Sequence, residues 1–257
     1  MSPDDLRIWL NHFEYHAEHP RRVPEGLSAV LKADERRLIA DSIATFQLGE
    51  QSEGGTLLRA AQRFAQLHAA GELVRIVELF IREEQRHAAL LRAFMEEHGI
   101  PVKRRDWTDR VFRRLRRLAG FELCVHVLIA AELVGNVYYR ALEAATGCQR
   151  LKVLCRTLVA DELAHVGFES QMLVALRAHK PPAVRAAMRW AHRAFFAGVS
   201  CVVWLTHRAV LRRAGYGVTS FLRVCQAQYA FYLEPCAVGH SVAQVRKPTK
   251  MSLRWGR

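Results

Sequence analysis

Glutamates interrupt the apolar faces of four long segments that otherwise have the pattern of buried helices. In the segment over residues 72–98, Ile76, Phe80 and Leu91 share one helical face, and Glu84 falls on that face. Apolar residues three and four positions apart predict a helix whose apolar stripe is buried. A buried carboxylate without a partner costs several kcal/mol. The chain is therefore limited to folds that bring these glutamates together around compensating charge.

Glycine and proline residues divide the chain into helical segments, and no strand-like alternation of useful length occurs. We predict helices near residues 4–16, 33–69, 72–98, 107–147, 151–179, 183–215 and 219–233. The predicted class is all-α. Residues 1–32 form an N-terminal helix and connector, 33–180 an antiparallel four-helix bundle, 181–235 two helices that cover the bundle, and 236–257 a basic tail.

Two of the four bundle segments carry the spacing Glu-x-x-His, as Glu84 with His87 and Glu162 with His165. Residues three apart lie on one helical face, so both side chains of each pair can reach one metal ion. Carboxylate oxygen and imidazole nitrogen suit iron or manganese. The spacing alone occurs by chance, but both pairs lie on apolar stripes, which points to a metal site inside the bundle.

The other two bundle segments each add a glutamate. Glu132 and Glu162 lie equally far from Gly147 on either side, so a hairpin that turns there places them level. In the first hairpin, the same comparison around Gly71 mildly favours Glu53 over Glu50. Four glutamates balance two divalent cations, and this ligand set is that of dinuclear helical bundles. The alternative is that these carboxylates lie at helix edges and pair with arginines.

Three fragments resemble motifs of the ferritin-like di-metal carboxylate superfamily, the first two a motif of its oxidase and oxygenase members and the third the Gly-Glu of rubrerythrin helices, rather than storage ferritin. They are EEQRH (Glu83 to His87), DELAH (Asp161 to His165, with Ala164 where the motif has Arg) and QLGEQSEG around Glu50. The resemblance covers roughly residues 40–178. It implies a ferritin-like fold, Glu83 or Asp161 as the carboxylates that orient the histidines, Glu53 as a bridging or shifting carboxylate, and metal ligands at Glu50, Glu84, His87, Glu132, Glu162 and His165.

The resemblance implies a di-iron enzyme that activates dioxygen to hydroxylate, desaturate or N-oxygenate a small organic substrate, which is free or carrier-bound. Two iron ions are the expected cofactor, with manganese or a mixed manganese–iron pair as alternatives. No flavin or nicotinamide motif is visible, so the electrons are expected from a separate reductase or ferredoxin. A homodimer is compatible with this interpretation. The alternative is a ferroxidase, a peroxide-handling protein or another metal-binding protein.

Cysteine usage and the first residues indicate a cytoplasmic protein. The six cysteines form no CxxC pair, which is typical of reduced thiols, and the sequence MSPDDLRIWL lacks the basic-then-apolar order of a signal peptide. The longest stretch without a charge or histidine, residues 194–206, is too short to span a bilayer, and we expect it to cover the bundle rather than to dock on a membrane.

The formal net charge of +13 is concentrated in the tail and in a basic segment. Scattered, solvated arginines explain part of this charge, and an acidic carrier protein, RNA or an anionic membrane surface could bind the rest. A module that binds RNA or an acidic partner is thus a further alternative, which the inward-facing glutamates disfavour. The basic residues of interest are Lys103, Arg104, Arg105, Arg113, Arg114, Arg116 and Arg117.

Two more side chains bear on the site. Tyr139 lies two turns after Glu132 on the same face, and it is either a redox-active or hydrogen-bonding tyrosine close to the metals or an ordinary core residue. Glu169 follows His165 by one turn and could be an extra ligand, but we expect it to be exposed or salt-bridged.

Overall fold

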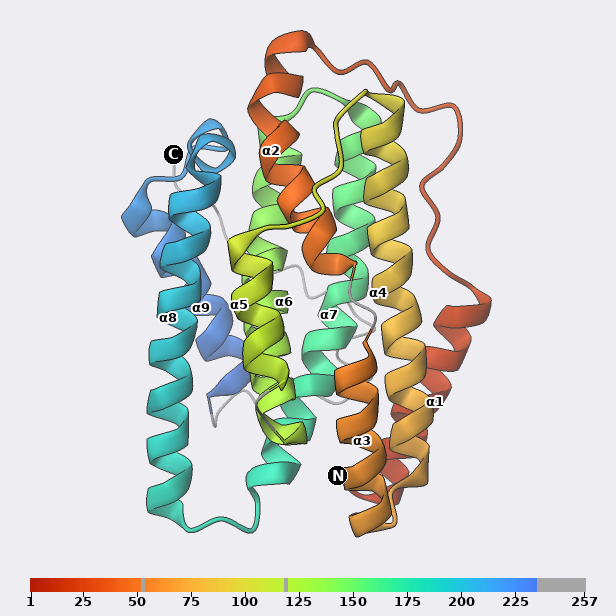
Figure 1. Cartoon of the computed structure of the whole chain (residues 1–257), viewed down its shortest axis with the longest axis vertical. Coiled ribbons are helices and arrows are strands. Elements are labelled where there is room, and N and C mark those ends of the chain that lie inside the picture. Colours follow the sequence, from red (N-terminus) through yellow and green to blue (C-terminus); the bar gives the residue numbers. More distant parts are fainter. Residues whose placement is uncertain (52–53, 118–119, 235–257) are drawn as a thin grey trace.

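The computed structural model of the chain describes residues 1–51, 54–117 and 120–234. Every regular element in these ranges is an α-helix, which confirms the all-α class. Figure 1 shows the long helices side by side as a bundle. The helices are α1 (Pro3–Glu18), α2 (Ala33–Glu50), α3 (Gly55–His68), α4 (Gly71–Glu97), α5 (Trp107–Arg117), α6 (Phe121–Ala145), α7 (Gln149–Arg177), α8 (Pro182–Arg213) and α9 (Val218–Leu233).

The α6–α7 hairpin forms the centre of the bundle. Helix α6 is apolar on nearly all sides and is buried along most of its length, as expected for a helix with neighbours all around it. The backbone N–H of Gly147, in the turn between α6 and α7, donates a hydrogen bond of 3.0 Å to the Glu35 carboxylate of α2. This bond ties the hairpin turn to α2 and helps to fix their relative height.

The predicted helix over residues 33–69 is wrong as one element, because the chain breaks between α2 and α3. Gly54 has a φ of +64°, which favours glycine, and a Cβ at this position would lie 2.5 Å from Cδ1 of Ile81. The backbone therefore turns close against α4. The break makes Glu50 the last residue of α2, directly beside the centre of the bundle.

The predicted helix over residues 107–147 is also wrong as one element. A helix begins at Trp107 as expected, but α5 ends at Arg117, and α6 begins at Phe121 after Gly120 in an extended conformation. The two parts have different surroundings, which explains the division. The α5 segment is basic and lies partly on the surface, whereas α6 is enclosed by α7, α8 and other helices.

The remaining helices cover the bundle on two sides. Helix α1 packs on α4, while α8 packs on α6 and α2, and α9 packs on α8 (Figure 1). The described residues form two apolar clusters, one containing Ile76, Val125 and Phe168 and the other containing Leu91, Leu142 and Leu158. Along α4 and α7, a polar layer separates the two clusters, and this layer contains the predicted metal ligands.

By length and composition alone, α6 and α8 are each long and apolar enough to cross a membrane. Residues 194–206, the stretch considered in the sequence, lack any charge and are too short to span a bilayer. A helix that is apolar on average can contain a few charged residues, so that criterion missed the full length of α6 and α8. In α6, 78% of the most apolar window is buried inside the protein, and in α8 the share is 44%. Buried core helices of soluble proteins have the same length and composition.

Candidate metal centre

Four glutamates and two histidines from α2, α4, α6 and α7 meet in the polar layer. They form two groups of possible ligands, Glu50 with Glu84, His87 and Glu162, and Glu84 with Glu132, Glu162 and His165. Within each group, one ligand atom of every residue lies within 4.8 Å of the others. Glu84 and Glu162 belong to both groups. The arrangement thus offers two adjacent ion positions that share two carboxylates.

Both histidines direct the same ring nitrogen towards the glutamates. Nδ1 of His165 lies 3.0 Å from Oε1 of Glu84 and 3.0 Å from Oε2 of Glu162. Nδ1 of His87 lies 3.0 Å from Oε1 of Glu162 and 3.6 Å from Oε1 of Glu84. Each Glu-x-x-His pair therefore approaches the centre as a unit, and the two pairs face each other across α4 and α7.

The other ring nitrogen of each histidine contacts a carboxylate from the opposite helix. Nε2 of His87 on α4 lies 3.2 Å from Oδ2 of Asp161 on α7, and Nε2 of His165 on α7 lies 3.1 Å from Oε2 of Glu83 on α4. An Nε2–H that donates to a carboxylate leaves the Nδ1 lone pair free for a metal ion. The sequence motif indicated these two carboxylates, but not that each orients the histidine of the other helix.

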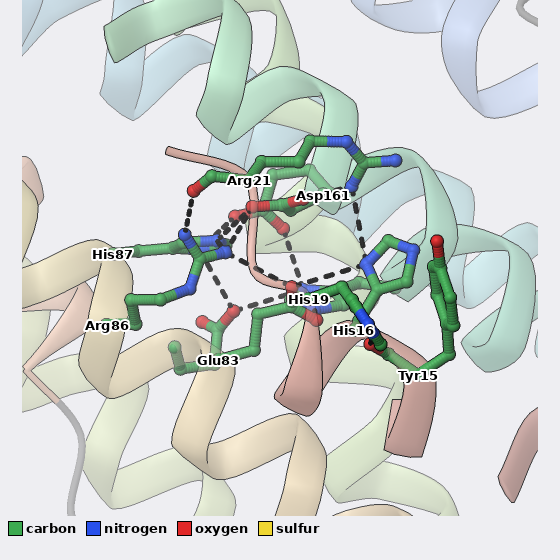
Figure 2. Close-up of polar contacts among 11 residues, drawn as sticks. Tyr15, His16, His19, Arg21, Glu83, Arg86, His87 and Asp161 are labelled. Carbon is green, nitrogen blue, oxygen red and sulfur yellow. Dashed lines mark hydrogen bonds and ion pairs between the residues drawn. The ribbon is translucent and has the colours of Figure 1, made fainter. Parts of the chain in front are cut away.

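Two arginines and a histidine surround these outer carboxylates (Figure 2). Arg21, in the connector after α1, and Arg86 of α4 both form ion pairs with Asp161. Arg86 also lies 3.2 Å from Glu83, and His16 of α1 lies 3.7 Å from the same carboxylate. Two arginines therefore face the two outer carboxylates, which also contact the histidines of the centre.

The electrostatics of the inner glutamates show negative charge confined in a small volume. Burial raises the pKa of Glu50 and of Glu132 well above the usual value, and the charges of Glu84 and Glu162 raise both further. Burial also acts to raise the pKa of Glu84, but contacts with His165 and His87 outweigh it, and that pKa is lowered. Crowding of carboxylates therefore disfavours the ionised forms of Glu50 and Glu132 unless positive charge compensates them.

The donor set fits divalent metal ions. Each inner ring nitrogen, Nδ1 of His87 and of His165, lies 3.0–3.6 Å from oxygens of Glu84 and Glu162. Several buried carboxylates so close together cost free energy unless positive charge compensates them, so their convergence calls for cations. Carboxylate oxygens with two imidazole nitrogens are the donors preferred by iron and manganese. The buried Glu and His groups could thus hold metal ions, whose identity the donor set narrows but does not fix.

Tyr139 of α6 takes part in the site rather than only in the core. Its hydroxyl donates a hydrogen bond to Oε1 of Glu50. The ring is also fully buried and contacts Phe46 edge to face, so it is at the same time a core residue. Burial, followed by the Glu50 charge, raises the pKa of the Tyr139 phenol well above its usual value, which keeps the hydroxyl protonated as a donor.

The expectation that Glu169 is exposed or salt-bridged is wrong. Glu169 is 2% exposed, and its Oε2 has no hydrogen-bond partner among the described residues. Burial raises its pKa well above the usual value, and the charge of Glu84 acts in the same direction. The sequence did indicate this position, because a residue one turn after His165 lies on the same, inward face of α7.

The remaining predicted residues lie elsewhere. Glu53, Arg116, Arg117 and the tail over 236–257 lie outside the residues or side chains that the structure describes. In the basic segment, Lys103 pairs with Asp41 at 2.6 Å, and Arg113 pairs with Asp109 at 2.7 Å. Arg104, Arg105 and Arg114 are exposed. Intramolecular pairs therefore reduce the free charge of this segment.

Comparison with protein-family models, with curated proteins and with solved structures finds no significant match to this chain.

Proposed function

We propose that this chain is a ferritin-like di-metal carboxylate protein that binds two iron ions and activates dioxygen to oxidise an organic substrate. One observation carries the proposal: two groups of ligands share Glu84 and Glu162 and meet at the end of an apolar cavity. The ligand set is a glutamate from each of two helices and a Glu-x-x-His from each of two others, as in dinuclear bundles. A manganese or mixed manganese–iron pair is the alternative cofactor.

Each residue has a definite role in this proposal. Glu50 and His87 hold one ion, Glu132 and His165 hold the other, and Glu84 and Glu162 serve both. Two bound ferrous ions would supply electrons for the reduction of dioxygen. Asp161 and Glu83 fix the orientation of the histidines, and the Tyr139 hydroxyl holds Glu50. Further electrons come from an external reductase or ferredoxin, in the cytoplasm.

The cavity supports an organic substrate over the ferroxidase alternative. Glu50, Glu84, Glu132 and Glu162 all line it, so the candidate ion positions border the cavity. Most of the remaining lining is apolar, from α2, α4, α6 and α8. A protein whose substrate is iron itself needs a polar route by which the ion reaches the site. An apolar cavity instead keeps water away from reactive oxygen species and suits an organic substrate.

The proposal is tested by titrating anaerobic protein with ferrous iron and then admitting dioxygen. We expect uptake of about one dioxygen for each pair of irons, and saturation at about two irons per chain. The double variant Glu132→Ala/His165→Ala should show neither. Glu96→Gln, on an exposed part of α4, is the matched control and should behave as the wild-type protein does.

Ferroxidase activity gives a different result in the same titration. If roughly twenty ferrous ions per chain are oxidised in successive rounds, as in a protein whose substrate is iron, the organic-substrate proposal is wrong. If the wild-type protein takes up no more dioxygen than the double variant, dioxygen activation at this site is wrong altogether.

A further inference from the structure

The candidate metal centre has two unlike sides. On the histidine side, Phe13 of α1 stacks on His165, and the outer carboxylate network closes the remaining space. On the glutamate side lies a cavity of about 160 Å³. A cavity of about 150 Å³ lined by apolar side chains binds benzene in another protein, so this volume suits a group of about that size.

The walls of the cavity come from helices on both sides of the bundle. Phe46 of α2, Phe80 of α4, Phe112 of α5, Leu128 of α6, and Val199 and Val203 of α8 all line it. No lysine or arginine is among the described lining residues. A ligand in this space gains from burial of apolar surface, and no side chain of the described lining would pair with an anion.

Most polar lining groups already have partners inside the protein. Thr206 donates to the carbonyl of Val202 in its own helix, at 2.8 Å. Thr45 donates to the carbonyl of Asp41 and accepts from Lys103. The Thr108 hydroxyl donates to Asp106, and Asp109 pairs with Arg113. These groups are therefore not free to select a ligand.

His207 is the exception. It lines the cavity at a kink of α8, where its φ of −114° and ψ of 15° depart from helical values. Its Nδ1 lies 2.8 Å from the hydroxyl of Ser42, which in turn lies 2.9 Å from the hydroxyl of Tyr138. Nε2 has no hydrogen-bond partner among the described residues, and the ring is held beside Phe46, with centroids 4.9 Å apart. One ring nitrogen is thus fixed and the other is available.

His207 is also uncharged at neutral pH. Burial lowers the pKa of its imidazole to about 4, and the charge of Lys103 acts in the same direction. A neutral imidazole nitrogen forms a hydrogen bond with a hydroxyl, carbonyl or amide group, but it gives no charge attraction to a carboxylate or phosphate.

We propose that the cavity binds an uncharged substrate consisting of an apolar part about as large as one six-membered ring and a single neutral hydrogen-bonding group that meets Nε2 of His207. That the bound molecule is a substrate rests on the proposed function, because its apolar part then lies next to the four glutamates that would hold the metal ions. The binding itself follows from the cavity and His207 alone.

The test is calorimetric titration of the full-length protein, both metal-loaded and metal-free, with benzyl alcohol, toluene and benzoate. We expect benzyl alcohol and toluene to bind both forms, and benzoate not to bind the metal-free form, in which no cation can hold its carboxylate. His207→Phe should weaken benzyl alcohol about five-fold, which is the net effect of one hydrogen bond, and should leave toluene unchanged. Comparing the two ligands separates the hydrogen bond from any general change in the cavity.

A second pair of variants tests the location. Val203→Phe fills the cavity and should abolish binding of both ligands, whereas Leu205→Phe, on the exposed side of the same helix, should leave both unchanged. Thermal unfolding checks that each variant is folded. The inference is wrong if wild-type protein binds neither ligand, if benzoate binds the metal-free protein as tightly as benzyl alcohol does, or if folded Val203→Phe binds like wild type.

Metal content of the same samples separates this inference from the proposed function. Wild-type protein with two irons and no ligand binding overturns the substrate class and leaves the metal site standing. Ligand binding that depends on His207 in protein that takes up no metal supports the cavity and overturns the proposed function.

Discussion

At the scale of single residues, the histidines of the candidate centre each contact a carboxylate that lies outside the two inner ligand groups. Asp161 of α7 orients His87 of α4, and Glu83 of α4 orients His165 of α7. A carboxylate that accepts from the outer nitrogen fixes the tautomer and makes the inner nitrogen a stronger ligand. The crossed arrangement means that the geometry of each histidine also depends on the distance between α4 and α7.

Replacing Asp161 by asparagine should lower metal affinity while the protein stays folded. The amide keeps the volume of the side chain but removes its charge, so His87 loses its acidic partner. Loss of such an outer partner typically costs 10–100-fold in metal affinity. Competition with a chelator measures the affinity, and Asp109→Asn, which affects an ion pair on α5, is the control. Equal affinities for Asp161→Asn and the wild-type protein would show that Asp161 does not support His87.

At the scale of elements, buried histidines join the covering helices to the bundle. Nε2 of His192 on α8 donates to the carbonyl of His126 on α6, at 3.0 Å, and its Nδ1 lies 3.3 Å from the hydroxyl of Tyr229 on α9. Burial lowers the pKa of His192 to about 4, and the charge of Arg177 lowers it further. Burial of the α6–α8–α9 contact therefore favours the neutral form of this imidazole.

This contact should weaken as the pH falls. In the unfolded chain the pKa of a histidine is about 6.5, so between pH 6.5 and 4 the unfolded state binds a proton that the folded state excludes at His192. Stability is then lost at up to about 1.4 kcal/mol per pH unit, or about 3 kcal/mol in all. Urea unfolding at pH 7 and pH 5 should show a smaller loss for His192→Gln than for the wild-type protein. Identical losses would contradict a neutral, buried His192, and contributions from the metal ligands cancel in the comparison.

The elements also show how much the sequence could predict. The Glu-x-x-His spacing and the equal distances of Glu132 and Glu162 from Gly147 were enough to predict that Glu84, His87, Glu132, Glu162 and His165 come together, because spacing on a helix and register in a hairpin are local properties. The comparison around Gly71 was less informative, since it favoured Glu53, whereas the structure places Glu50 in the first ligand group. The break before Gly54 depends on the close approach of Ile81 in another helix, and no local pattern reports such a contact. The same holds for Arg21, which reaches Asp161 from a distant part of the chain.

At the scale of the whole molecule, the additional helices give the bundle a closed side and an open side. Helix α1 and the Arg21 connector cover the histidines, whereas α5 and α8 line a cavity on the side of the glutamates. Apolar clusters lie on both sides of the polar layer along α4 and α7. The sequence could not predict this asymmetry, because the apolar faces of the four predicted bundle helices look alike. The asymmetry results from the way the outer helices pack around the bundle.

The most direct test of the central claim is the metal content of the full-length protein after growth with added iron, measured by mass spectrometry beside Glu84→Ala/His165→Ala and the exposed control Glu96→Gln. We expect about two irons per chain in the wild-type protein and in Glu96→Gln, and none in the double variant, because Glu84 belongs to both ligand groups. Folded wild-type protein that contains no more metal than the double variant would show that these residues do not form a metal centre.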